Sequence, residues 1–367
     1  MTARYSRQTV LPEIGPSGQT LLGKARILVV GAGGLGAPAL LYLTAAGVGL
    51  RQLGGCIGII DDDHVDHSNL QRQIVFRESD QGKPKASSTA AHLSLLNSET
   101  CLIAHTERLT AANALALLTD YDIVIDGSDN FATKYLINDA AVKLGKPVVY
   151  GSILGFEGQV SVFSAPHGPC YRCIYPEAAQ GHIPNCAEAG TLGGIAGVIG
   201  SMQAIEACKL ALGAEHCQSH DLVPLIGKLL LFDARNWDIR KLDVSRQPDC
   251  PVCSRPTGDI RLDQPSSPMC STQTVTAITL ADLNDLYESG VPVTLIDVRS
   301  EAEWASGYLN GALHMPLPLL LADDADLSQL DPQSLIIVYC QQGIRSQQAA
   351  QHLAQRGFNV LNLKTAF

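Results

Sequence analysis

The stretch GAGGLG, residues 31–36, decides the fold of the chain. It follows a short apolar run, ARILVV at 25–30, and it precedes APALLYLTAAG at 37–47, in which apolar residues recur at helical spacing. The predicted order is therefore strand, glycine turn and helix. Glycines let the backbone turn sharply and approach a phosphate, which then binds the free N–H groups at the start of the helix. We expect a nucleotide to bind at Gly31, Gly33, Gly34 and Gly36.

The alternation of strand and helix patterns continues to residue 150. Candidate strands are ARILVV, CIGIID, TCLIAH, YDIVID and PVVYGS, and candidate helices lie near 34–46, 84–96, 111–119 and 131–144. This pattern predicts an α/β fold with a Rossmann-like, doubly wound and mostly parallel sheet, which binds ligands at the carboxyl ends of its strands. Asp61 ends the second strand, where an acid can accept hydrogen bonds from ribose hydroxyls.

Charged side chains at the predicted strand ends favour ATP over a nicotinamide cofactor. Arg72 lies in IIDDDHVDHSNLQRQ at 59–73, Lys85 opens a helix within GKPKA, and Asp129 follows the fourth strand in DGSDN. Asp129 offers the hard oxygen ligand that Mg²⁺ prefers. Attack of a carboxylate on an α-phosphate needs both a metal and cations, because charge builds on the phosphoryl oxygens and the leaving pyrophosphate.

Eleven cysteines in an intracellular chain indicate metal ligands and reactive thiols rather than disulfides. Two C-x-x-C pairs, Cys170 with Cys173 and Cys250 with Cys253, predict a tetrahedral Cys₄ zinc site of structural type. Cys186 lies between the pairs, in the polar stretch AAQGHIPNCAEAG. It is either a nucleophile beside the nucleotide or an incidental thiol.

A second unit follows a Pro- and Ser-rich stretch. We predict an N-terminal domain at 1–255, a linker at 256–275 and a small C-terminal α/β domain at 276–367. The strand LIIVYC leads into CQQGIRS at 340–346 and then into a helix. Inward-pointing N–H groups and the positive end of that helix favour a thiolate at Cys340.

Composition limits the possible partners and the location. The net charge of −10 argues against nucleic acid and anionic membranes as main partners. The start, MTARYSRQTV, has no apolar signal core, so we expect a cytoplasmic protein. The apolar stretch 189–205 is glycine-rich and is followed by Glu206 and Lys209, which favours a buried helix over a membrane span.

These motifs together resemble a known family. Residues 1–255 resemble the MoeB/ThiF type of ubiquitin-activating-like adenylyltransferases, and residues 276–367 resemble a rhodanese domain. The matching stretches are RYSRQ, GAGGLG, IIDDD with SNLQRQ, GKPKA, SDN, CYRC, NCAEAG, CPVC, LIDVRSEAEWASGYLNGA and CQQGIRS. The fused order resembles the molybdopterin-synthase adenylyltransferase/sulfurtransferase proteins.

The resemblance implies an enzyme that uses MgATP to adenylate the C-terminal Gly-Gly carboxylate of a small ubiquitin-like sulfur carrier. It implies that Cys340 then carries a persulfide from a sulfur donor and gives a thiocarboxylate. It implies that Cys186 links to the carrier or helps to resolve the persulfide. It implies that Asp61 holds the ribose, that Arg72 and Lys85 bind phosphates and that Asp129 binds Mg²⁺. Asn69 is a further cofactor-binding residue, and Arg7 reaches into the site of the neighbouring subunit of a homodimer.

The sequence departs from the family pattern at several positions. Lys134 stands where members usually carry an arginine, so the charge is kept without the planar fork for bidentate binding. LRQLGGC at 50–56 is longer than expected; it either distorts the loop near Asp61 or bulges into solvent. Tyr308 stands where the rhodanese pattern usually has histidine, and the pattern usually runs on into a Gly-Gly and a further helix.

Other functions remain as alternatives. One is a nicotinamide-dependent oxidoreductase, which requires a catalytic acid–base pair that the candidate residues do not supply. Another is a non-catalytic scaffold that only recruits the carrier. Two further alternatives are also adenylating enzymes. In one the rhodanese domain is inactive, and in the other the carrier belongs to a thiamine or other sulfur-carrier pathway.

Overall fold

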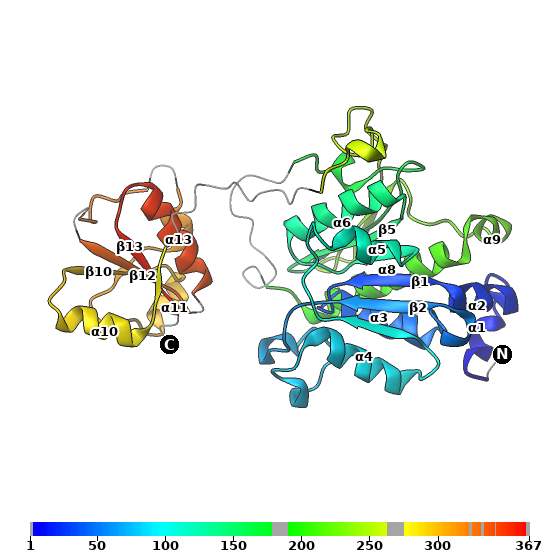
Figure 1. The fold of residues 1–367 in the computed structure, drawn as a ribbon, viewed down its shortest axis with the longest axis horizontal. Coiled ribbons are helices and arrows are strands. Elements are labelled where there is room, and N and C mark those ends of the chain that lie inside the picture. The colour runs from blue at the N-terminus through cyan, green and yellow to red at the C-terminus, as the bar shows by residue number, and fades with distance from the viewer. Residues whose placement is uncertain are drawn as a thin grey trace. The chain divides into compact units, whose positions relative to one another are not determined.

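The computed structural model describes residues 3–177, 190–262, 275–322, 325–331, 334–341 and 343–364. The chain divides into two compact units, Met1–Ser267 and Pro268–Phe367, and each has its own sheet and core (Figure 1). Residues 256–262 of the predicted linker belong to the first unit, since Ile260 is buried and its carbonyl accepts a hydrogen bond of 2.7 Å from Lys143 Nζ. The rest of that linker, 263–274, lies outside the described residues.

The first unit is built on an eight-stranded sheet in the order β3-β2-β1-β4-β5-β6-β7-β8. Strands β3 to β5 are parallel, and β6, β7 and β8 continue the sheet in antiparallel fashion. The strands are β1 (Arg26–Val30), β2 (Cys56–Ile60), β3 (Leu102–His105), β4 (Ile123–Asp126), β5 (Val148–Leu154), β6 (Glu157–Phe163), β7 (Lys228–Asp233) and β8 (Asp238–Asp243). The predicted parallel strands are confirmed, and the order reverses beside β1, where doubly wound sheets bind ligands.

Helices cover both faces of this sheet because the buried strands are apolar on both sides (Figure 1). Ile27 and Val29 of β1 pack with helices α2, α3, α4 and α8 on one face, while Leu28 and Val30 pack with α5 and α6 on the other. The helices are α1 (Ser6–Thr9), α2 (Gly15–Lys24), α3 (Gly36–Ala45), α4 (Lys85–Leu96), α5 (Ala114–Thr119), α6 (Phe131–Leu144), α8 (Gly193–Leu212) and α9 (Ala214–Ser219).

Helix α8 is long and apolar enough to cross a membrane by length and composition alone, and half of its apolar window is buried in the protein. It packs against α3 and β5. Gln203 on α8 donates to the carbonyls of Asp126 and Val149, at 2.8 and 3.1 Å, and Glu206 accepts a hydrogen bond from the amide of Leu225 at 2.7 Å. These contacts confirm the prediction that the apolar stretch forms a buried helix, because they tie α8 into the core of the first unit.

The extra residues before β2 stay at the surface. Arg51–Leu53 form an exposed turn of 3-10 helix that ends at Gly54 in the left-handed conformation. This turn precedes β2, whereas Asp61 follows it, so the insertion lies at the opposite end of the strand and leaves the Asp61 loop undistorted.

The second unit has a five-stranded parallel sheet in the order β11-β10-β12-β13-β9. Helices α12 and α13 pack on one face and α10 on the other. Its elements are β9 (Ala277–Ile278), α10 (Leu280–Glu288), β10 (Val293–Asp297), α11 (Glu301–Ala305), β11 (Leu313–His314), α12 (Leu317–Leu320), β12 (Leu335–Tyr339), α13 (Ile344–Gln355) and β13 (Val360–Leu363).

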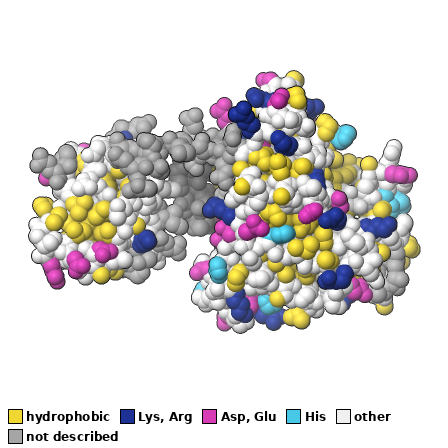
Figure 2. Space-filling view, in the orientation of Figure 1, with side chains coloured by type: hydrophobic (Ala, Val, Ile, Leu, Met, Phe, Trp, Pro, Cys, Tyr) yellow, Lys and Arg dark blue, Asp and Glu magenta, His cyan; other side chains and the backbone are white. Residues whose placement is uncertain are grey.

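The visible surfaces of the two units differ in charge (Figure 2). Basic and acidic side chains are interspersed on the first unit, whereas acidic side chains gather over α10 of the second. That helix exposes Asp282, Asp285 and Glu288.

Candidate functional site

The glycine turn after β1 packs directly against the turn after β4. Gly31 has φ +92°, and a Cβ atom there would lie 2.8 Å from the carbonyl oxygen of Gly127. A Cβ on Gly36 would lie 1.8 Å from the carbonyl oxygen of Gly31. Only glycine fits at both positions, because one requires the left-handed region and both require close backbone approach. The amide of Gly127 also donates to the carbonyl of Val30, at 2.8 Å.

Asp61 ties the end of β2 to the glycine turn. Its Oδ2 accepts a hydrogen bond from the amide of Ala32 at 2.8 Å, and its Oδ1 accepts one from Asp63 at 2.9 Å. Burial raises the pKa of the Asp61 carboxyl, while the nearby Lys85 cation and the two amides oppose that shift. Each carboxylate oxygen has a further lone pair, so the carboxylate can still accept a ribose hydroxyl.

The SNLQRQ stretch folds into the short helix His67–Asn69 and places Arg72 against the glycine turn. Asn69 Oδ1 accepts a hydrogen bond from the amide of Asp66 at 3.2 Å, which closes a capping box. Arg72 Nη1 donates to the carbonyl of Ser68 at 3.2 Å. The Cδ atom of Arg72 lies 3.4 Å from the position of a Cβ on Gly34. Arg72 is thus beside the turn, while the Asn69 carboxamide oxygen is engaged in the cap.

Lys85 begins α4 and is buried beside the same loop. Its Nζ lies 3.0 Å from Oδ2 of the exposed Asp63. The structure therefore places Asp61, Arg72 and Lys85 near the glycine turn, where the sequence predicted a nucleotide site.

Asp129 is exposed at the turn after β4, and the adjacent Asn130 caps α6 by accepting a hydrogen bond from the amide of Thr133 at 2.9 Å. Lys134 does not reach the surface of this turn. It is 5% exposed, and its Nζ lies 3.2 Å from Asp126 Oδ2 and 3.0 Å from the carbonyl of Gly151. Lys134 was expected to keep the charge of the family's arginine at this turn without its planar fork; in the structure the cation instead has a buried partner within the fold.

Two predicted site residues are placed less fully. Arg7 is exposed on α1. Cys186 lies outside the described residues.

The four predicted metal-ligating cysteines come together. Their Sγ atoms lie within 4.8 Å of one another, and all four residues are buried. The Cys170–Cys250 and Cys173–Cys253 pairs are each 3.5 Å apart, and the amide of Gln247 donates to Cys173 Sγ at 3.4 Å. Burial, and then the neighbouring sulfurs, raise the pKa of Cys170. The raised pKa means that thiolates are unfavourable in this buried cluster when no cation is present. A bound divalent cation would stabilise the thiolates, so the four sulfurs fit a tetrahedral zinc site.

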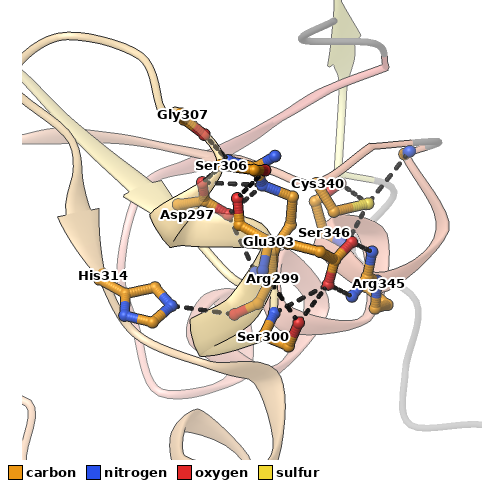
Figure 3. Close-up of polar contacts among 11 residues, drawn as sticks. Asp297, Arg299, Ser300, Glu303, Ser306, Gly307, His314, Cys340, Arg345 and Ser346 are labelled. Atoms are coloured by element: carbon orange, nitrogen blue, oxygen red, sulfur yellow. Dashed lines mark hydrogen bonds and ion pairs between the residues drawn. The ribbon is translucent and has the colours of Figure 1, made fainter.

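Cys340 lies at the end of β12, in a loop that surrounds its sulfur with hydrogen-bond donors (Figure 3). Its Sγ accepts hydrogen bonds from the amide of Gly343 at 3.1 Å and from the amide and hydroxyl of Ser346, both at 3.4 Å. Gly343 has φ +81°, and a Cβ there would lie 2.6 Å from the carbonyl of Lys364. The strand–C-x-x-G-x-R–helix pattern predicted inward-pointing N–H groups, and the structure places them on the sulfur.

Two ion pairs beside this loop were not anticipated (Figure 3). Arg345 forms a bidentate pair with Glu303, with N–O distances of 2.8 and 2.6 Å. Arg299 is buried against Asp297 at 2.7 Å and also donates to the carbonyl of Gly307 at 2.6 Å. The charge pattern D-x-R-x-x-x-E in LIDVRSEAE indicates that ion pairs can form here. The sequence alone does not show which arginine pairs with which carboxylate.

Aromatic side chains surround the position where the rhodanese pattern usually has histidine. Tyr308 stacks on Trp304 with ring centroids 3.8 Å apart, and Trp304 also stacks with His314 at 4.6 Å. His314 Nε2 lies 3.0 Å from the carbonyl of Arg299.

The fold and these sites define a Rossmann-like α/β unit with a glycine turn and a four-cysteine cluster, joined to a unit that surrounds one cysteine sulfur with hydrogen-bond donors. The model of the ThiF family matches residues 5–252, and that of the rhodanese-like domain matches residues 279–367. The chain belongs to the ThiF family and carries a C-terminal rhodanese-like domain.

Two relatives match this chain over nearly its full length, and a third matches about two thirds of it. The chain is 40% identical over 368 residues to the "Probable adenylyltransferase/sulfurtransferase MoeZ" of Mycobacterium tuberculosis, covering 97% of this chain and 89% of that protein. It is 40% identical over 371 residues to the "Adenylyltransferase and sulfurtransferase MOCS3" of Aedes aegypti, covering 96% and 82%. A "Sulfur carrier protein adenylyltransferase" of Thermus thermophilus is 49% identical over 256 residues, covering 68% and 90%.

Among solved structures, E. coli MccB shares the fold, with a TM-score of 0.58 at 20% identity over 69% of this chain and 72% of that one. Together, the two domains and the full-length relatives identify an enzyme with adenylyltransferase and sulfurtransferase activities.

Proposed function

We propose that this enzyme adenylates the C-terminal Gly-Gly carboxylate of a small ubiquitin-like sulfur carrier and then converts it into a thiocarboxylate. The observation that carries the proposal is the grouping of Asp61, Arg72 and Lys85 around a glycine turn in one unit, with a cysteine held by three donors in the other. One site suits a nucleoside triphosphate, and the other suits a sulfur anion.

In the adenylation step, a carrier carboxylate oxygen attacks the α-phosphorus of ATP, and the bond between that phosphorus and the bridging oxygen breaks. Pyrophosphate leaves, and nearby cations are needed to stabilise the negative charge that develops on it. Arg72 and Lys85 supply them beside the glycine turn, and the turn's amides bind phosphate oxygens. Asp61 holds the ribose, and Asn69 contributes from the same loop.

Asp129 is the proposed Mg²⁺ ligand. Its exposed carboxylate fits an ion that takes one or two protein carboxylates and completes its shell with water and substrate phosphates. When bound, Mg²⁺ neutralises the phosphate charge that develops during transfer.

The four cysteines are proposed to hold zinc in a structural role, because four thiolates leave no open coordination position. The two C-x-x-C segments lie about 80 residues apart in sequence, so one ion fastens two distant loops together.

In the sulfur step, the terminal sulfur of a Cys340 persulfide attacks the acyl carbon of the adenylate and displaces AMP, which leaves the carrier joined to Cys340 through an acyl disulfide. A thiol then attacks Cys340 Sγ, breaks the S–S bond and releases the thiocarboxylate. The disulfide that remains on Cys340 is reduced by an external thiol. Donors from Gly343 and Ser346 hold the sulfur anion in the loop. Cys186 is the candidate thiol that links to the carrier or helps to resolve the persulfide.

The proposal extends to the assembly and the pathway. We propose a cytoplasmic homodimer in which Arg7 reaches the neighbouring site, a persulfide protein as the sulfur donor, and a carrier of the molybdopterin-synthase small-subunit type. Carriers of thiamine and other pathways are the competing partners.

The test is carrier-dependent exchange of pyrophosphate into ATP, measured with a panel of small Gly-Gly-ended proteins. Exchange with one carrier that is lost in Asp129→Ala supports adenylation and identifies the pathway. The Cys340→Ala variant should keep exchange and lose thiocarboxylate, detected by mass spectrometry. No exchange with any carrier, from folded metal-loaded protein, would favour the scaffold alternative; exchange without thiocarboxylate would favour an inert rhodanese unit.

A further inference from the structure

A buried polar network lies directly beneath the turn that carries Asp129. Lys134, Asp126 and Gln203 are 5%, 2% and 0% exposed, and they come from α6, β4 and α8. Charged side chains this deeply buried are costly unless they are paired and hydrogen-bonded. Their position under a candidate metal ligand therefore calls for a functional explanation.

The network fixes the turn through Asp126. One carboxylate oxygen, Oδ1, accepts hydrogen bonds from the amide of Ser128 at 3.0 Å and from its hydroxyl at 2.6 Å. The other, Oδ2, lies 3.2 Å from Lys134 Nζ. Lys134 thus holds the carboxylate that in turn holds the residue preceding Asp129.

The same lysine joins the turn to the neighbouring strand. Its Nζ donates to the carbonyl of Gly151 on β5 at 3.0 Å, and it lies 5.1 Å from the ring centroid of Tyr150. Gln203 Nε2 donates to the carbonyls of Asp126 and Val149. The end of β4 and the first half of β5 are therefore fastened from two helices at once.

This fastening reaches the phosphate site. Gly127, between Asp126 and Ser128, packs against the glycine turn so tightly that a Cβ there would lie 3.0 Å from the carbonyls of both Gly31 and Val30. The distance between the phosphate-binding turn and Asp129 is therefore set by backbone contacts that Asp126 and Lys134 hold in place.

We propose that Lys134 is a positioning residue that fixes Asp129 relative to the glycine turn, so that the Asp129 carboxylate would hold the divalent cation of a metal–nucleotide complex. The proposal rests on the proposed function, because it assumes that Asp129 binds the metal of a metal–nucleotide complex. Lys134 itself touches neither ligand. Outer partners of this kind typically change metal affinity about 10- to 100-fold when removed.

The test measures metal binding directly, without turnover. Mn²⁺ is titrated into the full-length, zinc-loaded chain with a non-hydrolysable ATP analogue, and free Mn²⁺ is followed by electron paramagnetic resonance. Amide hydrogen exchange of the segment 127–130 is measured in parallel. The variants are Lys134→Met, the milder Lys134→Gln in case the first does not fold, and Lys134→Arg, which keeps the charge.

Lys209→Met is the matched control. Lys209 also pairs with a buried acid, Glu206, at 2.6 Å and also donates to a carbonyl, that of Val223, at 3.2 Å. It lies on α8 away from the Asp129 turn, so its loss should reduce stability without changing metal affinity.

We expect Lys134→Met and Lys134→Gln to weaken Mn²⁺ binding at least about tenfold and to speed exchange at 127–130, with Lys134→Arg within about threefold of the parent. Mn²⁺ affinity within twofold of the parent in both neutral variants would overturn the positioning role and leave the proposed function intact. Equal weakening by Lys209→Met would also overturn it, since the effect would then be general destabilisation. A parent chain that binds no Mn²⁺ with the analogue would overturn both proposals.

Discussion

The ion pair between Glu303 and Arg345 should stabilise the rhodanese-like unit and hold the Cys340 loop. Glu303 Oε2 accepts hydrogen bonds from the amide and hydroxyl of Ser300, and both carboxylate oxygens meet the guanidinium of Arg345. One carboxylate thus caps α11 and fastens the start of α13. We predict that Glu303→Gln lowers the stability of this unit in a pH-dependent way.

The size of the effect follows from the carboxyl group's pKa. The Arg345 hydrogen bonds, with those of Ser300, lower the pKa of Glu303 from 4.5 to about 2. The full shift is worth roughly 3 kcal/mol, and partial exposure of both side chains reduces this to about 1–2 kcal/mol. Because the folded-state pKa is depressed, this stability is present above pH 4.5 and is lost as the pH falls towards 2.

The chain offers an internal probe for the measurement. It has two tryptophans, Trp237 in the first unit and Trp304 beside Glu303 in the second. Trp237 is 75% exposed, so Trp237→Phe should leave the fold intact and make Trp304 the sole reporter. Urea unfolding of Trp237→Phe, with and without Glu303→Gln, followed by Trp304 fluorescence between pH 7 and 2.5, gives the stability difference directly.

Glu301→Gln is the matched control, since Glu301 is an exposed glutamate in the first turn of the same helix. It should change stability by less than about 0.5 kcal/mol. A Glu303→Gln loss below about 0.5 kcal/mol at pH 7, or one of the same size at pH 7 and pH 2.5, would refute the reasoning.

Three further outcomes follow from the sites. Lys85→Ala should raise the ATP concentration for half-maximal pyrophosphate exchange at least about tenfold, because a charge-assisted phosphate contact is lost; an unchanged value would remove Lys85 from the phosphate site. Cys253→Ser should reduce bound zinc, measured by plasma mass spectrometry, from one per chain to near zero and lower the melting temperature of the first unit; full zinc occupancy would contradict the ligand set. Ser346→Ala should slow sulfur transfer about three- to tenfold by removing one donor to Cys340 while leaving exchange unchanged, and an unaltered transfer rate would show that the backbone amides suffice.

Local patterns were enough to predict the elements that build the phosphate site. The helix predicted at 131–144 is observed as α6 with the same bounds, because Asn130 caps its start and Gly145 in the left-handed conformation ends it. The first strand, the glycine turn and α3 were also predicted, because their own residues carry the pattern of each element. In each case the cap, the glycine or the apolar pattern lies within the element that it predicts, so no contact with distant residues has to be known.

Elements without such a local signal were missed. Strand β8, DIRKLD, has no apolar alternation and is exposed along its whole length, so it forms only because β7 offers an edge to pair with. The pairing of Lys134 with Asp126 was missed for a related reason. A lysine just inside a helix is usually a surface charge, and only the assembled sheet shows that it points into the protein.

The four-cysteine cluster has a consequence for how the chain holds together. Cys170 and Cys250 are 80 positions apart, and the segment between them contains α8, β7 and β8. A metal bound there closes a loop of that length, which lowers the entropy of the unfolded chain by an amount worth about 4.5 kcal/mol at 25 °C if it acts as a covalent cross-link does. The ion would thus limit how far α8, the helix that fastens the nucleotide-side strands, can separate from them, although it never meets the nucleotide.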